Sequence, residues 1–241
     1  MPRSKPRGSI ATVIGKRLAA TSDPKTKLWW DRYLKGAIPF RGVPMAGIRQ
    51  IVHEVWAERE LDRLPLQERI EVALRQFEQR HAEDKLAGVL MLGELLLNDL
   101  TTEHVTDLAR PFEKHICDWG TCDWYCVKVL GRFVETDDRR TRAQLIAEWR
   151  HAEPFWQRRA AAVAFVNLAP RGDAFFRGFT SLLLTVCAAN VKDAARFSQT
   201  GVGWLLRELS RAEPERVRAF VDEHEAEMSK EALKAATARL P

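Results

Sequence analysis

An indole and a carboxylate lie one helical turn apart in the segment that contains Trp119 and Asp123. Residues spaced i, i+4 share one face of a helix, so the two side chains would lie next to each other. A fixed carboxylate can stabilise positive charge that develops as a bond breaks, and an indole face attracts a cation. The pair alone is a weak motif, because an acid in the first turn of a helix is common.

A basic residue and a second indole, Arg159 and Trp204, occur at comparable points of later helical segments. A guanidinium can form paired hydrogen bonds with a phosphate or a carboxylate. With Asp123 and Trp119 these residues outline a surface that could hold a nucleic-acid backbone against an anionic catalytic group. Taken singly, Arg159 could instead pair with Glu153 at the surface, and either indole could belong to the core.

The elements that position these residues are predicted to be helices, because apolar residues recur at three-to-four spacing from residue 9 to the end. Pro154 and Pro214 suit the first turn of a helix, and Ser229 suits an N-cap. Breaks between helices are expected at Pro39 to Gly47, Pro65, Glu83-Asp84, Pro111, Asp137-Asp138, Pro154, Pro170 to Gly172, Pro214 and Ser229.

A repeat is visible in the second helix of each predicted pair, where a polar lead residue precedes small residues. The lead residues Lys85, Asp123, Arg159 and Thr200 are separated by 38, 36 and 41 residues, and a shorter unit begins near Lys230. A period near forty with two helices per unit is typical of HEAT-like repeats. We therefore predict an all-α, curved α-solenoid (superhelix), with the lead residues in line on its concave surface.

Composition and charge describe a globular protein with an excess of base: 241 residues, 46% hydrophobic, 29% charged, net charge +5. We expect a basic disordered arm at residues 1–8 and a single domain over residues 9–241. The longest apolar run, residues 88–97, is about half a membrane span, and no apolar segment follows the basic N-terminus. We expect a cytoplasmic monomer without a membrane partner, and the Arg-rich charge favours nucleic acid.

The cysteines could suggest a metal site, since Cys117, Cys122 and Cys126 are close together. Their spacing is not a usual zinc spacing, and Cys122 and Cys126 at i, i+4 are better interpreted as a packed pair in a helix. We therefore expect no metal and no cofactor.

Tryptophan outnumbers tyrosine eight to two. A helical protein can bury indoles with a large gain in apolar contact. We expect Trp29, Trp30, Trp56 and Trp149 in the core.

Four segments in order carry a resemblance to a known family. They are Tyr33 to Gly36 with Phe40 to Val43, Trp119-x-x-x-Asp123, Trp156 to Ala161, and Gly203 to Glu208. Over roughly residues 25–240 the chain resembles the AlkD-like DNA alkylation repair glycosylases. The resemblance implies HEAT-like repeats that wrap duplex DNA and remove cationic N3- and N7-alkylated purines. It also implies that the base is not drawn into a deep pocket, which would allow bulky adducts.

Residue by residue, the resemblance implies that Asp123 is the catalytic carboxylate, flanked by the indoles of Trp119 and Trp204 and by Arg159. The chain departs from the family pattern at Gly120, where an Asp is usual, and at Thr200, where a basic residue is common. The expected further DNA contacts are Arg158, Arg196, Arg207 and Thr200.

The chemistry of such a site is consistent with these residues. Alkylation makes the purine a cation and a good leaving group, so no general acid is needed. Asp123 would stabilise charge on the deoxyribose and orient water, while Arg159 would hold a phosphate and keep the acid aimed. No Lys belongs to the predicted constellation, so strand cleavage through an imine is not expected. Asp123→Asn should slow base release strongly with little effect on folding.

Two other function classes fit the same sequence. One is a DNA-binding protein that kept the fold and lost turnover, and the other is a scaffold for protein partners. Phosphate contacts make affinity fall steeply with added salt, so salt dependence would separate DNA binding from protein binding.

Overall fold

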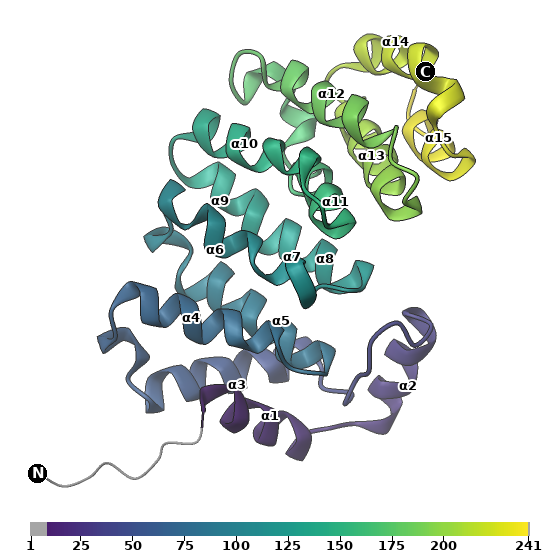
Figure 1. The fold of residues 1–241 in the computed structure, drawn as a ribbon. Coiled ribbons are helices and arrows are strands. Elements are labelled where there is room, and N and C mark those ends of the chain that lie inside the picture. Colours follow the sequence, from purple (N-terminus) through teal and green to yellow (C-terminus); the bar gives the residue numbers. More distant parts are fainter. Residues whose placement is uncertain (1–8, 241) are drawn as a thin grey trace, which may run out of the picture. The chain divides into compact units, whose positions relative to one another are not determined.

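The computed structural model describes residues 9–240, and these are helical without a strand. The all-α prediction is confirmed (Figure 1). The chain forms two compact units: residues 9–99 with Lys114–Thr121, and Leu100–Glu113 with the chain from Cys122 onward. The arm predicted at residues 1–8 lies outside the described residues. Within residues 9–240, every helix is too short or too polar to span a bilayer.

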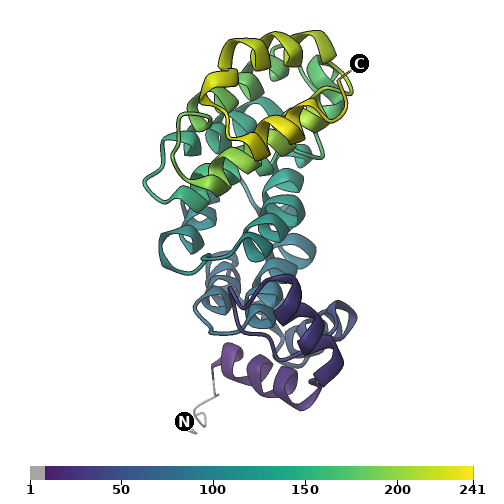
Figure 2. The same cartoon turned by 90° about the vertical axis from the view of Figure 1, so that its right-hand side faces the viewer.

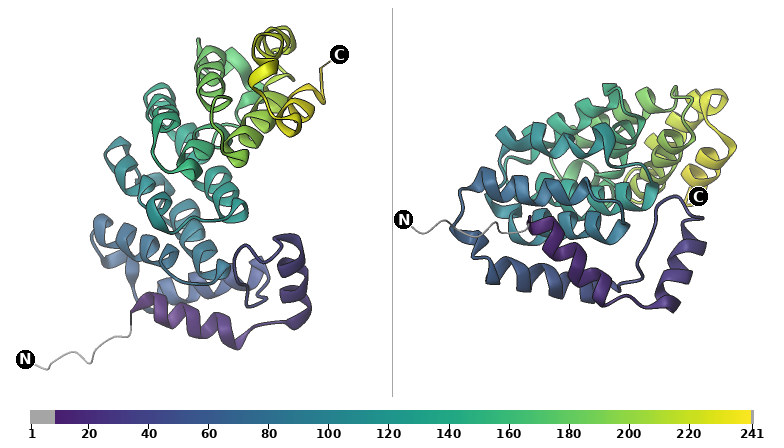
Figure 3. Two further views of the ribbon diagram at one scale, coloured as in Figure 1. Left: turned by 45° about the vertical axis from the view of Figure 1, so that its right-hand side comes forward. Right: turned by 60° about the horizontal axis from the view of Figure 1, so that its bottom comes forward.

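Among the described residues, the first unit contains five complete α-helices and a wide π-helical turn. They are α1 (Ile10–Ala20), α2 (Pro24–Tyr33), α3 (Met45–Glu58), α4 (Leu66–Phe77) and α5 (Ala82–Leu90), with the π-helical turn at Met91–Leu95. Figure 3 shows α2 set apart from α1 and α3 and joined to α3 by an extended connection. None of the residues of α2 is buried.

The position of α2 corrects one prediction about the core. Trp29 is 55% exposed, although it was expected to be buried. Only one side of α2 meets the unit, and there Trp30 packs against the small cluster that contains Leu34 and Phe40. Trp29 lies on another side of the helix and stacks on Tyr33, with ring centroids 5.1 Å apart. The predicted burial of Trp56 and Trp149 is confirmed.

The connection from α2 to α3 is held by a buried carboxylate. Glu83–Asp84 was expected to break a helix, but both residues lie in the first turn of α5. Glu83 Oε1 accepts hydrogen bonds from the backbone N–H groups of Arg41, Gly42 and Val43, at 2.9, 2.7 and 3.1 Å. A carboxylate is favoured at a helix N-terminus, so the acid stabilises both elements. Gly42 has φ 96°, and a Cβ there would lie 2.2 Å from a backbone oxygen, so only glycine fits.

The second unit continues with shorter helices. They are α6 (Val105–Ala109), most of α7 (Pro111–Lys114), the end of α8 (Trp119–Tyr125), a π-helical turn (Cys126–Leu130), α9 (Gly131–Thr136), α10 (Arg139–Ala147), α11 (Phe155–Val163), α12 (Phe179–Asn190), α13 (Arg196–Leu209), α14 (Pro214–His224) and α15 (Lys230–Thr237). Two predicted starts are confirmed: Pro214 opens α14, and the Ser229 side chain accepts the Ala232 N–H at the start of α15.

The repeat predicted from the lead residues is present in the structure. Asp123, Arg159 and Thr200 are each the fifth residue of their helices, α8, α11 and α13, and Lys85 is the fourth residue of α5. Within the second unit α11 packs on α13, and α13 packs on α15 (Figure 2). Equivalent turns of neighbouring helices are thereby brought side by side.

Close stacking of α13 on α15 requires a residue without a side chain at Gly203. A Cβ there would lie 2.6 Å from the Ala232 carbonyl oxygen. Gly203→Ala is expected to lower the free energy of unfolding by about 1–3 kcal/mol, because α15 must move away. Thermal unfolding would measure this. Gly15→Ala in α1, where the added Cβ would meet its nearest atom at 3.4 Å, should not destabilise the protein. Equal stability of both variants would contradict the close contact.

Candidate active site in the second unit

The centre of the site is an ion pair between neighbouring repeats. Arg159 Nε donates to Asp123 Oδ1 at 2.8 Å, and Arg159 Nη2 donates to Asp123 Oδ2 at 2.9 Å. Arg159 is only 5% exposed, so this pair is screened little by solvent. Burial alone would lower the pKa of Arg159, but the Asp123 carboxylate more than offsets that effect, and the pKa lies above its ordinary value. The alternative partner Glu153 is not used.

The remaining hydrogen bonds of Arg159 reach the next repeat. Its Nη1 donates to the Phe197 carbonyl oxygen at 2.7 Å and to Thr200 Oγ1 at 3.1 Å. Four of the five guanidinium N–H groups are therefore directed at protein acceptors. This geometry makes Arg159 a positioning residue for Asp123. Its contact with a DNA phosphate stays a prediction.

The structure explains why a threonine fits at position 200, where the family pattern described above has a basic residue. Its hydroxyl accepts a hydrogen bond from Arg159 and lies 3.3 Å from the Phe197 carbonyl oxygen, to which it can donate. A cation at this position would repel the buried guanidinium. The threonine thus supports the Arg159–Asp123 pair, and no phosphate contact is needed to explain it.

A small hollow lies beside the carboxylate, with a volume of about 160 Å³. Its lining residues come from the α8 segment, the π-helical turn and α13: Asp123, Trp124, Val127, Lys128 and Trp204. Asp123 and Trp204 were predicted to share a site, and the hollow brings them together. Trp124 and Lys128 were missed, and Lys128 corrects the expectation that no lysine belongs to the site. Their i, i+4 spacing from one another, directly after the catalytic candidate, is the signal that could have found them.

Trp119 belongs to the first unit, where it contributes to an aromatic cluster. It meets Tyr33 edge to face, with ring centroids 5.2 Å apart, and packs against the cluster that contains Leu34 and Phe40. Trp119 and Asp123 lie on successive turns of α8, as the spacing predicted. A Cβ at Gly120 would lie 3.1 Å from a Leu34 methyl carbon, so a larger residue there would require local shifts.

The cysteine pair beside the site has the packing role expected from its spacing. Cys122 and Cys126 are fully buried as free thiols. Burial raises the pKa of the Cys126 thiol well above its ordinary value, so it stays protonated.

These features can be compared with known proteins. A family model described as DNA alkylation repair enzyme matches residues 14–240. The chain belongs to this family. It is also similar to a solved structure described as a predicted DNA alkylation repair enzyme from Enterococcus faecalis, with a TM-score of 0.76 and 19% identity over 91% of this chain and 97% of that chain. At that identity the likeness shows a shared fold. No curated protein matches the chain.

Membership of the DNA alkylation repair family gives this chain a role in alkylation repair and makes DNA its partner. The arginines predicted to contact DNA are occupied in the structure. Arg158 binds Asp193 at 2.6 Å, Arg196 pairs with Glu231 at 2.8 Å, and Arg207 pairs with its neighbour Glu208 at 3.0 Å. Exposed ion pairs contribute little to stability, so Arg196 could exchange its carboxylate for a phosphate at small cost. The DNA contacts of all three residues stay predictions.

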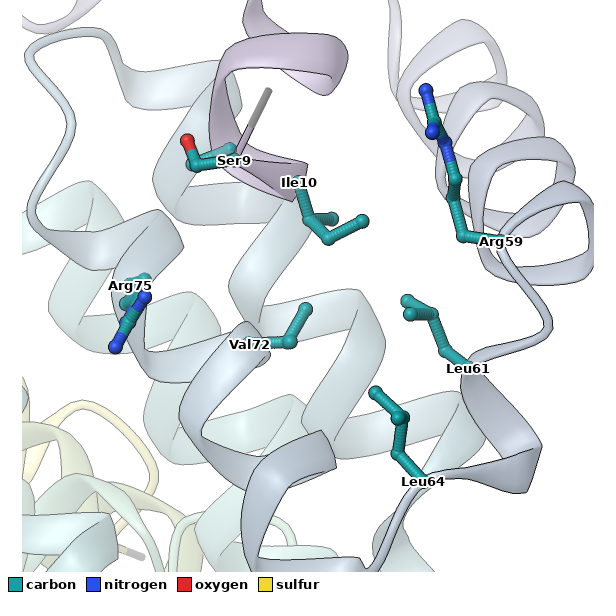
Figure 4. Close-up of a pocket in the computed structure, with 8 residues that line it drawn as sticks. Ser9, Ile10, Arg59, Leu61, Leu64, Val72 and Arg75 are labelled. Atoms are coloured by element: carbon teal, nitrogen blue, oxygen red, sulfur yellow. The ribbon is translucent and has the colours of Figure 1, made fainter. Parts of the chain in front are cut away.

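A larger cavity of about 270 Å³ lies in the first unit (Figure 4). Its walls are mainly apolar, with Ile10, Leu61 and Val72, and Arg59 and Arg75 lie at its sides. Among the described residues, those that line this cavity include no carboxylate, thiol or imidazole.

Proposed function

We propose that this protein is a monomeric, monofunctional DNA glycosylase that hydrolyses the N-glycosidic bond of cationic N3- or N7-alkylated purines in duplex DNA. The observation that carries the proposal is the Asp123 carboxylate, which a buried guanidinium holds at a hollow lined by two indoles. The family has a role in alkylation repair, and base removal is the specific reaction that we propose within that role.

The reaction requires few catalytic groups from the protein. As the C1′–N bond breaks, its electron pair neutralises the cationic purine, and positive charge develops on the deoxyribose. Asp123 would stabilise that charge, and a water would add to C1′ to leave an abasic site. A carboxylate has about four lone-pair positions, so oxygens that accept from Arg159 can also orient a water.

Arg159 would make the carboxylate effective by fixing it before the substrate arrives. Two parallel hydrogen bonds prevent rotation of the carboxylate plane. A group that is already oriented does not have to reorganise during the reaction, and such preorganisation accounts for much of electrostatic catalysis.

The size of the hollow supports action on a base that stays in the helical stack. Its volume of about 160 Å³ is below the ≈ 300–1,000 Å³ of typical small-molecule pockets. Every residue that lines the hollow is at least partly exposed, so the hollow is too open to enclose a purine drawn out of the duplex. The hollow suits a sugar or a piece of the backbone, and a lesion outside it could be bulky.

The test is release of free base from a duplex that contains one N7-methylguanine, with the unmodified duplex as control. We expect release of the modified base only, and a strand that stays intact until alkali is added, because a monofunctional enzyme leaves the abasic site uncut. A duplex with a bulky cationic N7 adduct should also be a substrate. Salt-dependent binding without release from either substrate would overturn the proposal in favour of a non-catalytic DNA-binding protein.

A further inference from the structure

The hollow beside Asp123 contains a cation that no part of the proposed reaction uses. Lys128 lies in the wide π-helical turn that follows α8, and its side chain is exposed. Its ammonium lies 5.6 Å from the centroid of the Trp124 ring, one helical turn earlier. π-Helical turns inside a helix occur frequently at functional sites.

Lys128 differs from the other basic residues near the site in having no carboxylate partner among residues 9–240. Arg159 is buried against Asp123, and Arg196 and Arg207 are paired with glutamates. An indole face attracts a cation without neutralising it, so the ring holds the ammonium in place and leaves its charge for a ligand.

The two indoles of the hollow add apolar ring surface beside the ammonium group. Neither the Trp124 nor the Trp204 N–H has an acceptor in the part of the chain that the structure describes. Both rings are partly exposed and line the hollow with Lys128. Apart from Asp123, the hollow therefore offers two indole rings, the Val127 side chain and one positive charge. That combination suits an anion with an apolar part attached.

We propose that Lys128 binds a backbone phosphate of the DNA strand whose deoxyribose lies against Asp123, while Trp124 and Trp204 contact the sugar. The proposal rests on the proposed function for the placement of the sugar, but the phosphate contact itself needs no turnover. An ammonium group would repel a cationic purine, so the hollow takes the backbone and excludes the lesion base. Lys128 thereby supplies the phosphate contact that was expected from Arg159.

The experiment measures the affinity of the full chain for an unmodified duplex at several salt concentrations. Each phosphate contact contributes about 0.9 to the slope of log K against log salt. Lys128→Met is expected to lower that slope by about this amount, and Lys128→Arg should retain it. Trp124→Ala should also lower the salt slope, because the Lys128 ammonium loses the ring that holds it in place. Trp124→Phe keeps a ring face and should retain the slope. Lys16→Met in α1 of the first unit is the control for loss of one exposed charge.

The outcomes separate the two proposals. A lower slope for Lys128→Met, with Lys16→Met unchanged, supports the phosphate contact even if no base release is ever found. An unchanged slope overturns it even if the protein proves to be a glycosylase. Equal losses in both variants also overturn it, because they would reflect net charge alone. A cation–π pair that only stabilised the helix would change thermal unfolding and leave the salt slope unaltered.

Discussion

Replacement of Asp123 by asparagine is expected to slow release of N7-methylguanine by about 100- to 1,000-fold, the typical effect of removing one electrostatic stabiliser. The amide has nearly the shape of the carboxylate but carries no charge to oppose the developing cation. Single-turnover rates with enzyme in excess would measure the chemical step. Binding of the unmodified duplex should change little, because an acid does not attract phosphate.

The structure also changes the expectation for folding of this variant. Arg159 is buried against Asp123, so Asp123→Asn leaves a guanidinium without its counter-charge. We therefore expect a lower free energy of unfolding, contrary to the neutral effect expected from the sequence. Asp222→Asn, at an exposed position of α14, is the matched control and should behave as wild type. Asp123→Asn with wild-type rates would remove this carboxylate from the mechanism.

Arg159→Met is expected to have the second large effect, on both activity and stability. Without the guanidinium the carboxylate can rotate away from its working position, and misplacement of about 1 Å costs roughly 100-fold in rate. Loss of one partner of a buried ion pair costs about 3–5 kcal/mol. We expect the lower end of that range, because Asp123 retains 16% side-chain exposure. Single-turnover rates and denaturant unfolding would measure the two effects.

A double variant separates the catalytic role of Asp123 from its role in folding. Asp123→Asn combined with Arg159→Met leaves no buried charge without a partner. The double variant should therefore be more stable than the sum of the two single effects, as expected for interacting residues. Its base release should stay as low as that of Asp123→Asn. Recovery of activity together with stability would show that the single variants failed only because they were poorly folded.

Features governed by short-range rules could be predicted from the sequence. Pro214 and Ser229 mark helix starts because a fixed φ and a side-chain acceptor act within one turn. The lead positions of Asp123 and Arg159 followed from the spacing of the repeat, which the helices preserve. The family resemblance, carried by segments in order along the chain, is confirmed by the match over residues 14–240.

Features that depend on how helices rotate against each other could not be predicted in this way. The partner of Arg159 lies 36 residues away, and only the packed helices show which side chain it meets. Trp29 was assigned to the core on residue type alone, but α2 presents only one side to its unit. Glu83 was interpreted as part of a helix break. Its carboxylate instead accepts hydrogen bonds from three backbone N–H groups that lie 40 to 42 residues earlier in the chain.

Arg159 links three successive helical repeats: it belongs to α11, holds the acid of α8 and donates to Phe197 and Thr200 of α13. In repeat proteins the terminal repeats have neighbours on one side only and open first. Opening of α13 would remove two of the acceptors that orient the guanidinium. The orientation of the Asp123 carboxylate therefore depends on α13, a helix to which Asp123 itself does not belong. Reactivity would be lost once opening from the C-terminal end has passed α15 and α14 and reached α13, while the helices before α13 are still folded.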